Sequence, residues 1–296
     1  MSRYITIIIT AALLLAACTK TEVAYDSPSE ISFAPVAENV TKTAVEGKDY
    51  TDDLGFNVFA NTIENVAYFA NIPFKPGTEK YQSRTVYVGN PTQYWPRTKS
   101  LNFAGYTGDK HAGATVTANM SSLTLTNYTL DKGHDLMYFF IDGVDKNTTY
   151  IAPTMHHACS WITIKVTGEN ACADWLITAM TLNGVSTSGD VTFTDGDAEW
   201  SGLGTGEAIG LFSGSTKISD FTSVESIVIP QTPAGLTISY NGKTTDPAIS
   251  LKYNGDNAWE AGKHYTYTLN FLNPYKIEFS VSGVEDWSGS QEIVIQ

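Results

Sequence analysis

Residues 265–271 read Tyr-Thr-Tyr-Thr-Leu-Asn-Phe, so large apolar side chains alternate with small polar ones. Successive side chains of a β-strand point to opposite faces, and this period of two therefore predicts a strand with one buried and one wet face. Aromatic and β-branched residues also favour strands. The stretch indicates an antiparallel sheet rather than a helix.

The same alternation, broken by turn residues, recurs along the chain, and no stretch has the pattern of a long helix. Strands are expected at residues 31–36, 56–60, 66–70, 85–88, 100–106, 122–125, 135–141, 158–166, 177–182, 191–193, 208–212, 226–230, 236–240, 248–253, 265–271 and 276–281. Two such series predict an all-β protein of two antiparallel β-sandwich domains in series. The polar stretch 142–153 lacks alternation, so we place the boundary there, giving domains 18–150 and 151–296.

Three short motifs predict hairpin turns. Asn241-Gly242 and Asn254-Gly255 can adopt positive φ at tight turns without steric cost. Asp195-Gly-Asp197-Ala-Glu199 has the alternate acids of a calcium loop but not the full set of ligands. We interpret this last motif as a hairpin turn as well.

The N-terminus has the layout of an export signal. Arg3 precedes an apolar run from Ile5 to Leu15 that is too short to cross a bilayer, and Leu15-Ala16-Ala17-Cys18 is a bacterial lipobox. Residues 1–17 are therefore predicted to be a lipoprotein signal peptide, and the mature chain is expected to begin at an acylated Cys18. The alternative is an ordinary cleaved signal with an accidental cysteine.

The composition of the chain argues against several classes of function. The formal net charge of −13 is spread along the chain, which argues against binding to nucleic acid or anionic lipid. No later apolar run could span a membrane, so a soluble body hanging from the lipid is expected. There is no G-x-S-x-G elbow, and we expect a protein without catalytic residues or cofactors, although acidic residues could still meet in space as a glycosidase pair.

Two cysteines and two histidines suggest metal or redox chemistry only weakly. His156-His157-Ala-Cys159 introduces a strand, where neighbouring side chains diverge, so no metal site is expected. Cys159 and Cys172 could form a disulfide after export, but a turn near Gly168 would hold them apart. Two buried free thiols are the favoured interpretation.

The aromatic residues leave two functions open. Trp95, Trp259 and Trp287, with Tyr94, could be core residues of the sandwiches or could stack on sugar rings. Coplanar exposed rings would favour a lipid-anchored surface glycan-binding protein, whereas buried rings would favour a structural protein.

Several short motifs follow one another along the chain in a characteristic order. They are the lipobox, Ile31-Ser-Phe, Tyr94-Trp-Pro, Leu101-Asn-Phe-Ala-Gly-Tyr, Asp135-Leu-Met-Tyr, His156-His-Ala, Ile227-Val-Ile-Pro-Gln231, Trp259-Glu-Ala-Gly-Lys-His-Tyr-Thr-Tyr-Thr-Leu269 and Val284-Glu-Asp-Trp287. This ordered set resembles the fimbrillin-like lipoproteins of Bacteroidetes, the subunits of type V pili, over essentially the whole mature chain.

The resemblance implies two transthyretin-like domains, export to the outer membrane through lipid on Cys18, and adhesion through a cell-surface fimbrium. It also implies that proteolysis removes the first strand, which holds Ile31 and Phe33, and that a strand of another pilus subunit replaces it. A cut between Asn39 and Asp53 would release that strand. The C-terminal strand, with Ile293, Val294 and Ile295, would be the donor. The alternative is that both end strands simply complete their own sheets.

One departure from the family affects processing. Family members cut by an arginine-specific protease carry arginine in this early loop, whereas the mature chain here has only Arg84 and Arg97, both later. Lys42 and Lys48 occupy the loop and are the candidate processing sites. Either another protease cuts there, or the chain keeps its first strand and caps, anchors or accompanies a pilus.

Overall fold

A computed structural model describes residues 29–37, 55–130, 134–232, 235–246, 248–251, 258–273 and 276–287. Within these residues the regular structure is β-strand apart from one short 3-10 helix, η1 (Ile218–Asp220). The all-β expectation is confirmed. Among the same residues, no helix has the length and apolar character needed to cross a membrane.

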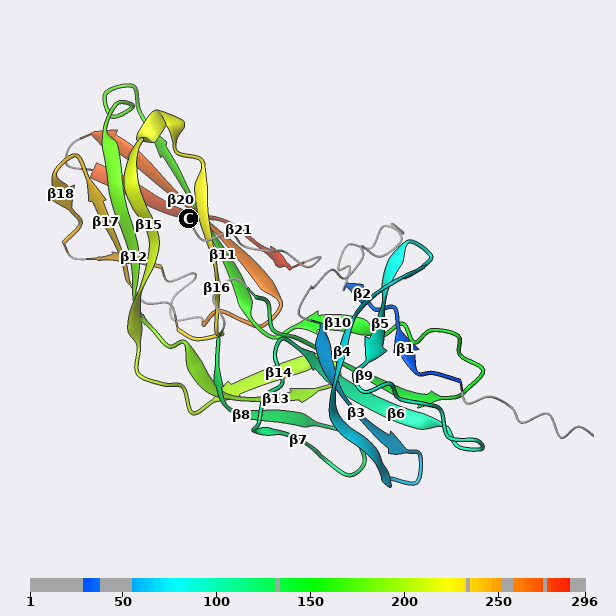
Figure 1. The fold of residues 1–296 in the computed structure, drawn as a ribbon. Coiled ribbons are helices and arrows are strands. Elements are labelled where there is room, and N and C mark those ends of the chain that lie inside the picture. The colour runs from blue at the N-terminus through cyan, green and yellow to red at the C-terminus, as the bar shows by residue number, and fades with distance from the viewer. Residues whose placement is uncertain are drawn as a thin grey trace, which may run out of the picture.

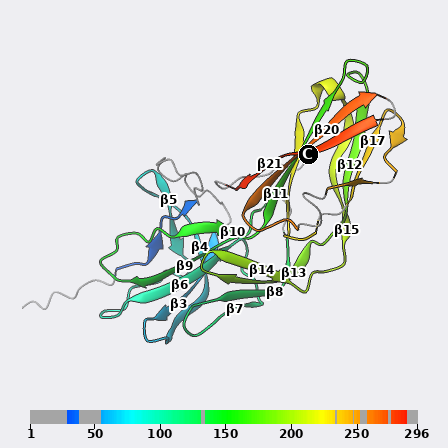
Figure 2. The same ribbon diagram turned by 180° about the vertical axis from the view of Figure 1, so that it is seen from behind.

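The strands form two lobes, seen from opposite sides in Figures 1 and 2. In the first lobe, one sheet has the order β1-β5-β4-β3-β6-β9-β10-β2 and the other has the order β14-β13-β8-β7. The strands of the first lobe are β1 (Ser32–Phe33), β2 (Val36–Ala37), β3 (Phe56–Thr62), β4 (Ala67–Tyr81), β5 (Arg84–Gly89), β6 (Leu101–Thr107), β7 (Ala114–Val116), β8 (Leu123–Thr129), β9 (Met137–Val144), β10 (Thr154–His157), β13 (Ser188–Thr194) and β14 (Asp197–Ser201).

In the second lobe, one sheet has the order β16-β11-β20-β21, and the other has the order β15-β12-β17-β18 with β19 also paired to β17. The strands of the second lobe are β11 (Ser160–Gly168), β12 (Leu176–Val185), β15 (Glu207–Lys217), β16 (Ser223–Val228), β17 (Gly235–Tyr240), β18 (Lys243–Thr244), β19 (Ile249–Ser250), β20 (Lys263–Asn273) and β21 (Lys276–Asp286).

The opening stretch 265–271 lies in β20, and its alternation is realised as expected. Tyr265, Tyr267 and Leu269 are buried in the core of the second lobe, between its two sheets. The intervening Thr266 and Thr268 are only partly buried. Buried apolar area of this kind contributes about 25 cal/mol per Å², so the period of two fixes which face the strand presents to the core.

The large sheet of the first lobe has a core on each face. Alternate residues of β3, β6 and β9 explain this: Phe103 and Phe139 face one core, while Tyr106 and Tyr138 face the other. The second core lies against β8 and β13, where the Tyr138 and Phe193 rings stack at 4.5 Å. A continuous apolar segment such as Met137–Phe139 is typical of a strand buried on both faces.

Among the strands that the structure describes, most pairing is antiparallel. β11 pairs in parallel with β20, and β2 pairs in parallel with β10. Among the predicted turns, Asn241 and Gly242 have φ of 46° and 73° between β17 and β18, and Gly196 has φ of 82° between β13 and β14. Both hairpins are confirmed, whereas Asn254-Gly255 lies outside the described residues.

Several strands differ from their predicted extents. The strand expected at 66–70 is the start of β4, which continues to Tyr81 through Pro76, next to an irregular register with β5. Proline is tolerated at such irregularities. β10 was not expected, because it lies where the alternation begins after a polar stretch.

The division into domains 18–150 and 151–296 stays a prediction. The sheet of β7, β8, β13 and β14 combines strands from both sides of residue 150, since β13 pairs with β8. In addition, one apolar core contains residues of both lobes, including Tyr138 of the first and Trp161 of the second.

Candidate functional site

The first described segment, residues 29–37, lies between two parts of the chain that follow it much later. On one side it runs antiparallel to β5, where Ser32 pairs with Val88 and Phe33 with Tyr87. The N–H of Ile31 donates to the Gln93 carbonyl at 2.8 Å, and further hydrogen bonds continue this edge toward residue 29.

On its other side the same segment runs parallel to residues 151–155. Here Ala34 N–H donates to the Ile151 carbonyl at 2.7 Å, and Ile151 N–H donates back to the Ser32 carbonyl at 2.9 Å. Val36 N–H donates to Pro153 at 3.0 Å, where β2 pairs with β10. The segment therefore closes the large sheet into a ring by satisfying the backbone groups of two strand edges at once.

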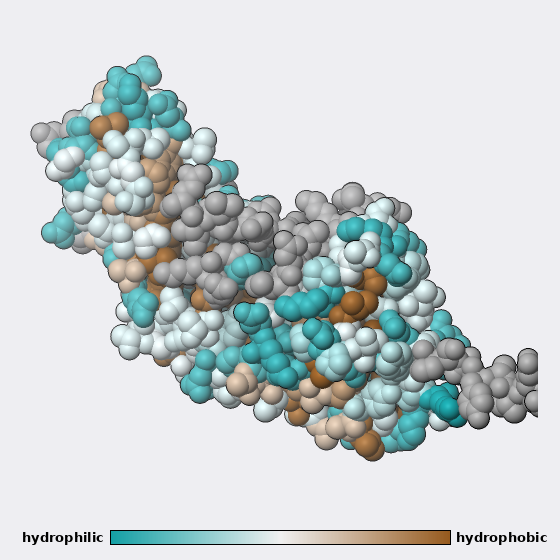
Figure 3. Space-filling view, viewed as in Figure 1, coloured by the Kyte–Doolittle hydropathy of each residue, from teal (hydrophilic) through white to brown (hydrophobic). Residues whose placement is uncertain are grey.

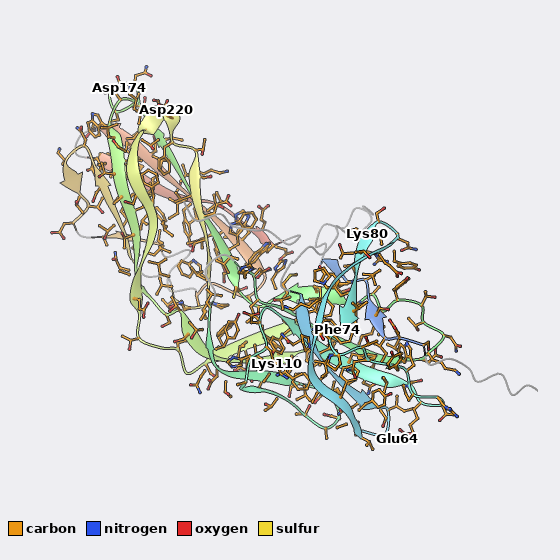
Figure 4. The ribbon with its side chains drawn as sticks, viewed as in Figure 1. Glu64, Phe74, Lys80, Lys110, Asp174 and Asp220 are labelled. Atoms are coloured by element: carbon orange, nitrogen blue, oxygen red, sulfur yellow. The ribbon has the colours of Figure 1, made fainter. Side chains whose placement is uncertain are left out.

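The side chain of Phe33 fills the centre of the core that this ring encloses. Its ring contacts the rings of four other phenylalanines at centroid distances of 4.9–5.7 Å, and it has no solvent exposure. These partners come from four strands and are Phe56, Phe74, Phe103 and Phe139. Phe74 is labelled in Figure 4 on β4.

Ile31 is also buried in this core, at 1% exposure, whereas Ser32 between the two is only partly buried. The structure thus places both apolar residues predicted on the first strand on its inner face. Whether that strand is displaced stays a prediction.

A second group of buried side chains joins the two lobes. Nδ1 of His157 in β10 lies 2.5 Å from Oδ2 of Asp135, which precedes β9. The His157 ring stacks on the indole of Trp287 at 4.2 Å, just after β21. The motifs that contain these residues predict no contact among them, because nothing in one sequence reports a contact between strands so far apart.

The same contacts continue into the second lobe. Trp161 of β11 lies 5.8 Å from Trp287 and stacks on His264 of β20 at 3.7 Å. Nδ1 of His264 faces the Glu285 carboxylate at 3.2 Å, and Nε2 lies 2.8 Å from Oγ1 of Thr163. Burial lowers the pKa of His264, and the Glu285 charge partly opposes this effect.

The tryptophans proposed for sugar stacking are buried. Trp95, Trp259 and Trp287 have exposures of 6%, 2% and 0%, and they lie in three different cores. The indole N–H of Trp259 donates to the Tyr267 hydroxyl at 2.7 Å. These rings cannot stack on a glycan, and of the four aromatic residues considered for stacking only Tyr94, at 42%, is exposed.

The cysteines and histidines considered for disulfide or metal chemistry do not come together in the structure. Cys159 and Cys172 are free, buried and in different cores, as the thiol interpretation expects. Burial raises the pKa of Cys159 well above its usual value. His156 contacts Tyr138 whereas His157 faces Asp135, so the two imidazoles diverge.

Several predicted site residues lie outside the described residues. They are Cys18, Lys42, Lys48, Ile293, Val294 and Ile295.

These features define an all-β protein of the sandwich class, in which the N-terminal strand is held between two later parts of the chain. A sequence model of the fimbrillin-like family matches residues 39–287, and the chain belongs to this family. No curated protein sequence matches the chain.

Solved structures share the fold. A candidate cell adhesion protein from Bacteroides uniformis is 20% identical with a TM-score of 0.59, and one from Bacteroides ovatus is 14% identical with a TM-score of 0.57; each comparison covers 88% of this chain and 98% of the other. A fimbrial protein from Bacteroides vulgatus is 14% identical with a TM-score of 0.56, over 88% of this chain and all of its own. At such identities the likeness establishes the β-sandwich fold.

Family membership supports the role of a fimbrial subunit at the cell surface that interacts with other subunits. It also favours a structural rather than an enzymatic protein.

Proposed function

We propose that the chain is a lipid-anchored subunit or accessory protein of a surface fimbria, and that its first strand is a plug which a strand of another subunit replaces. The observation that supports this most is the position of residues 29–37, which are hydrogen-bonded along both sides and anchored by the buried ring of Phe33.

Removal of this strand would expose the strand edges on both of its sides and the core behind it. Two rows of backbone groups, along β5 and residues 151–155, would lose their partners, and an aromatic pocket would open to water. Unpaired strand edges recruit other strands, and alternate apolar side chains of an incoming strand would refill the pocket. Loss of the plug would therefore drive assembly.

The chain order connects this event to the membrane. Ten residues separate Cys18 from Ser29, and residues 38–55 follow the plug before β3 begins. A cut after Lys42 or Lys48 would release plug and lipid together. An uncut chain would stay anchored at the outer membrane, which suits an anchor or a cap.

The C-terminal residues are the proposed donor. Ile293 and Ile295 alternate with Val294, as a strand inserted into an apolar groove requires. This donor segment follows Trp287, whose ring is fixed among His157 and Trp161.

Brief trypsin treatment tests the proposal. We expect cleavage after Lys42 or Lys48 and then oligomers by size-exclusion chromatography. The double variant Lys42→Gln, Lys48→Gln is the matched control and should stay monomeric. A synthetic peptide of residues 29–37 should suppress the oligomers, and the same peptide carrying Phe33→Ala should not.

Truncation after Trp287 separates the donor from the groove. The truncated protein should be nicked normally, and the nicked form should not oligomerise. Nicked full-length protein that stays monomeric would contradict strand exchange, and unchanged assembly of the truncated protein would remove residues 288–296 from the scheme.

A further inference from the structure

The first lobe has a polar pocket that takes no part in holding the first strand. Its volume is about 310 Å³, and it lies between the β6–β7 connection, the end of β8 and the residues that lead into β9. Its lining includes Asp109, Lys110, His111, Asn127, Tyr128 and His134. Lys110 is labelled in Figure 4, far from Asp174 and Asp220 at the tip of the second lobe.

Buried hydrogen bonds hold the wall formed by the β6–β7 connection. The hydroxyl of Tyr106 accepts from the backbone N–H of His111 at 2.7 Å and donates to Oδ1 of Asn71 at 2.9 Å. Burial raises the pKa of Tyr106 to about 12, so this hydroxyl keeps its proton. The wall is therefore fixed before any ligand arrives.

An irregularity in β8 shapes the opposite wall. The β8–β13 register shifts here, and Asn127 has φ of 53° with its N–H donating to Oδ1 of Asp190 at 2.7 Å. Such bulges re-aim side chains next to binding sites. The Tyr128 ring that follows is held edge-on by His111 at 5.7 Å and by Trp200 at 6.1 Å.

The third wall is fixed by Thr107. Its hydroxyl donates to the backbone carbonyl of Asp135 at 2.8 Å and accepts from Met137 N–H at the same distance. All three walls thus rest on hydrogen bonds to the scaffold, which lowers the entropic cost of binding.

The polar groups at the mouth of the pocket remain available to a ligand. Within the described part of the chain, the side chains of Asp109, Lys110 and Asn127 make no hydrogen bond or ion pair. Nε2 of His111 lies 2.6 Å from the Thr126 carbonyl, so Nε2 donates its proton to that oxygen.

Donors and acceptors of both charge signs around one aromatic ring suit a neutral polyhydroxylated ligand. Carboxylates accept from hydroxyl groups, and ammonium and amide groups donate to them. The carboxylates of Asp109 and Asp135 disfavour an anion. No group of three potential metal ligands occurs among the residues that the structure describes, which leaves a cation without a ligand set.

We infer that this pocket binds a neutral sugar residue, with the pyranose face against Tyr128 and its hydroxyls on Asp109, Lys110 and Asn127. The volume is at the lower end for small-ligand sites and fits one or two sugar units. A ligand of this size and polarity binds at roughly millimolar Kd, which suits adhesion through many subunits in parallel. The inference does not depend on strand exchange.

Saturation-transfer NMR on the mature chain tests it, with galactose, glucose, mannose and N-acetylglucosamine as probes. We expect transfer to at least one of them, reduced about tenfold in the double variant Asp109→Asn, Lys110→Ala. Both residues are exposed, so the fold should survive, which circular dichroism checks. Lys165→Ala, an exposed lysine on β11, is the matched control and should bind as the unmodified chain does.

Absence of transfer to all four sugars would overturn the inference, and so would equal transfer in the double variant. Stronger transfer to N-acetylneuraminic acid than to any neutral sugar would overturn the ligand class. The double variant should still oligomerise after trypsin treatment, so this proposal and strand exchange can fail separately.

Discussion

The rings of Phe33 and Phe74 meet edge to face, with centroids 4.9 Å apart and planes at 86°. One residue belongs to the first strand and the other to β4, two strands away in the sheet. Aromatic pairs in this geometry contribute about 0.5–1.5 kcal/mol beyond the area they bury. The contact therefore ties the N-terminal segment to the centre of the first lobe.

Replacement of Phe33 by alanine should destabilise the protein by about 3–5 kcal/mol, because it leaves a cavity among four aromatic rings. Chemical denaturation measures the effect. Ser32→Ala, on the outer side of the same strand, should change stability by less than about 0.5 kcal/mol. Equal effects of the two variants would show that the pocket does not hold this strand.

Trp287→Ala should also cost about 3–5 kcal/mol, since it removes a fully buried indole between His157 and Trp161. Calorimetry should give a lower Tm with the two lobes unfolding less cooperatively. Val284→Ala, at an exposed position of β21 just before Trp287, should leave the transition almost unchanged. An unaltered Tm in Trp287→Ala would mean that the junction contributes little.

His264 makes stability depend on pH. Burial lowers its pKa in the folded protein, so the unfolded chain binds the proton more tightly. This contribution is fully present above the unfolded pKa of about 6.5 and is lost as the pH falls from there through the lower folded pKa.

Thermal unfolding between pH 8 and pH 5 should therefore show a decline in Tm toward acid pH that is smaller in His264→Gln. The pKa of this imidazole also depends on the charges of Lys165, Glu225 and Glu285. Moderate salt should screen the effect of these charges more than it changes the effect of burial. Identical slopes in the two proteins would exclude His264 as the cause.

Cys159 and Cys172 should resist thiol reagents in the folded state. Neither side chain reaches solvent, and burial raises the pKa of Cys159, which suppresses the reactive thiolate. In Cys18→Ser protein, Ellman's reagent should label both thiols only after denaturation. Rapid labelling of the native protein would contradict this burial, and a mass change on reduction would reveal a disulfide.

In the face drawn in Figure 3, hydrophobic residues are scattered among polar ones rather than gathered into one broad area. The residues drawn in colour on this face therefore form no broad apolar docking area.

Much of the candidate site could be read from local sequence. The alternation of Ile31 and Phe33 predicted which face of the first strand is buried, and the structure agrees. Local sequence could not decide whether the tryptophans are core residues or stack on sugars. The residues around Trp95 and Trp259 would look the same whether the ring faces a core or solvent. Their burial among residues from distant strands decided it.

The sequence alone determined the β class and the inner face of strands such as β20, because both depend on the period of the side chains. It also determined the two hairpin turns, because these depend on residues that tolerate positive φ. Only the tertiary structure decided that residues 29–37 lie between β5 and residues 151–155, that Asp135 meets His157, and that β8 pairs with β13. The physical reason is that a period of two is a local property of the chain, whereas strand partners are chosen by satisfying backbone hydrogen bonds and burying apolar area over the whole molecule. The entropic cost of closing a loop grows only slowly with the length of the loop. The separation of two strands in the sequence therefore does not reveal whether they pair.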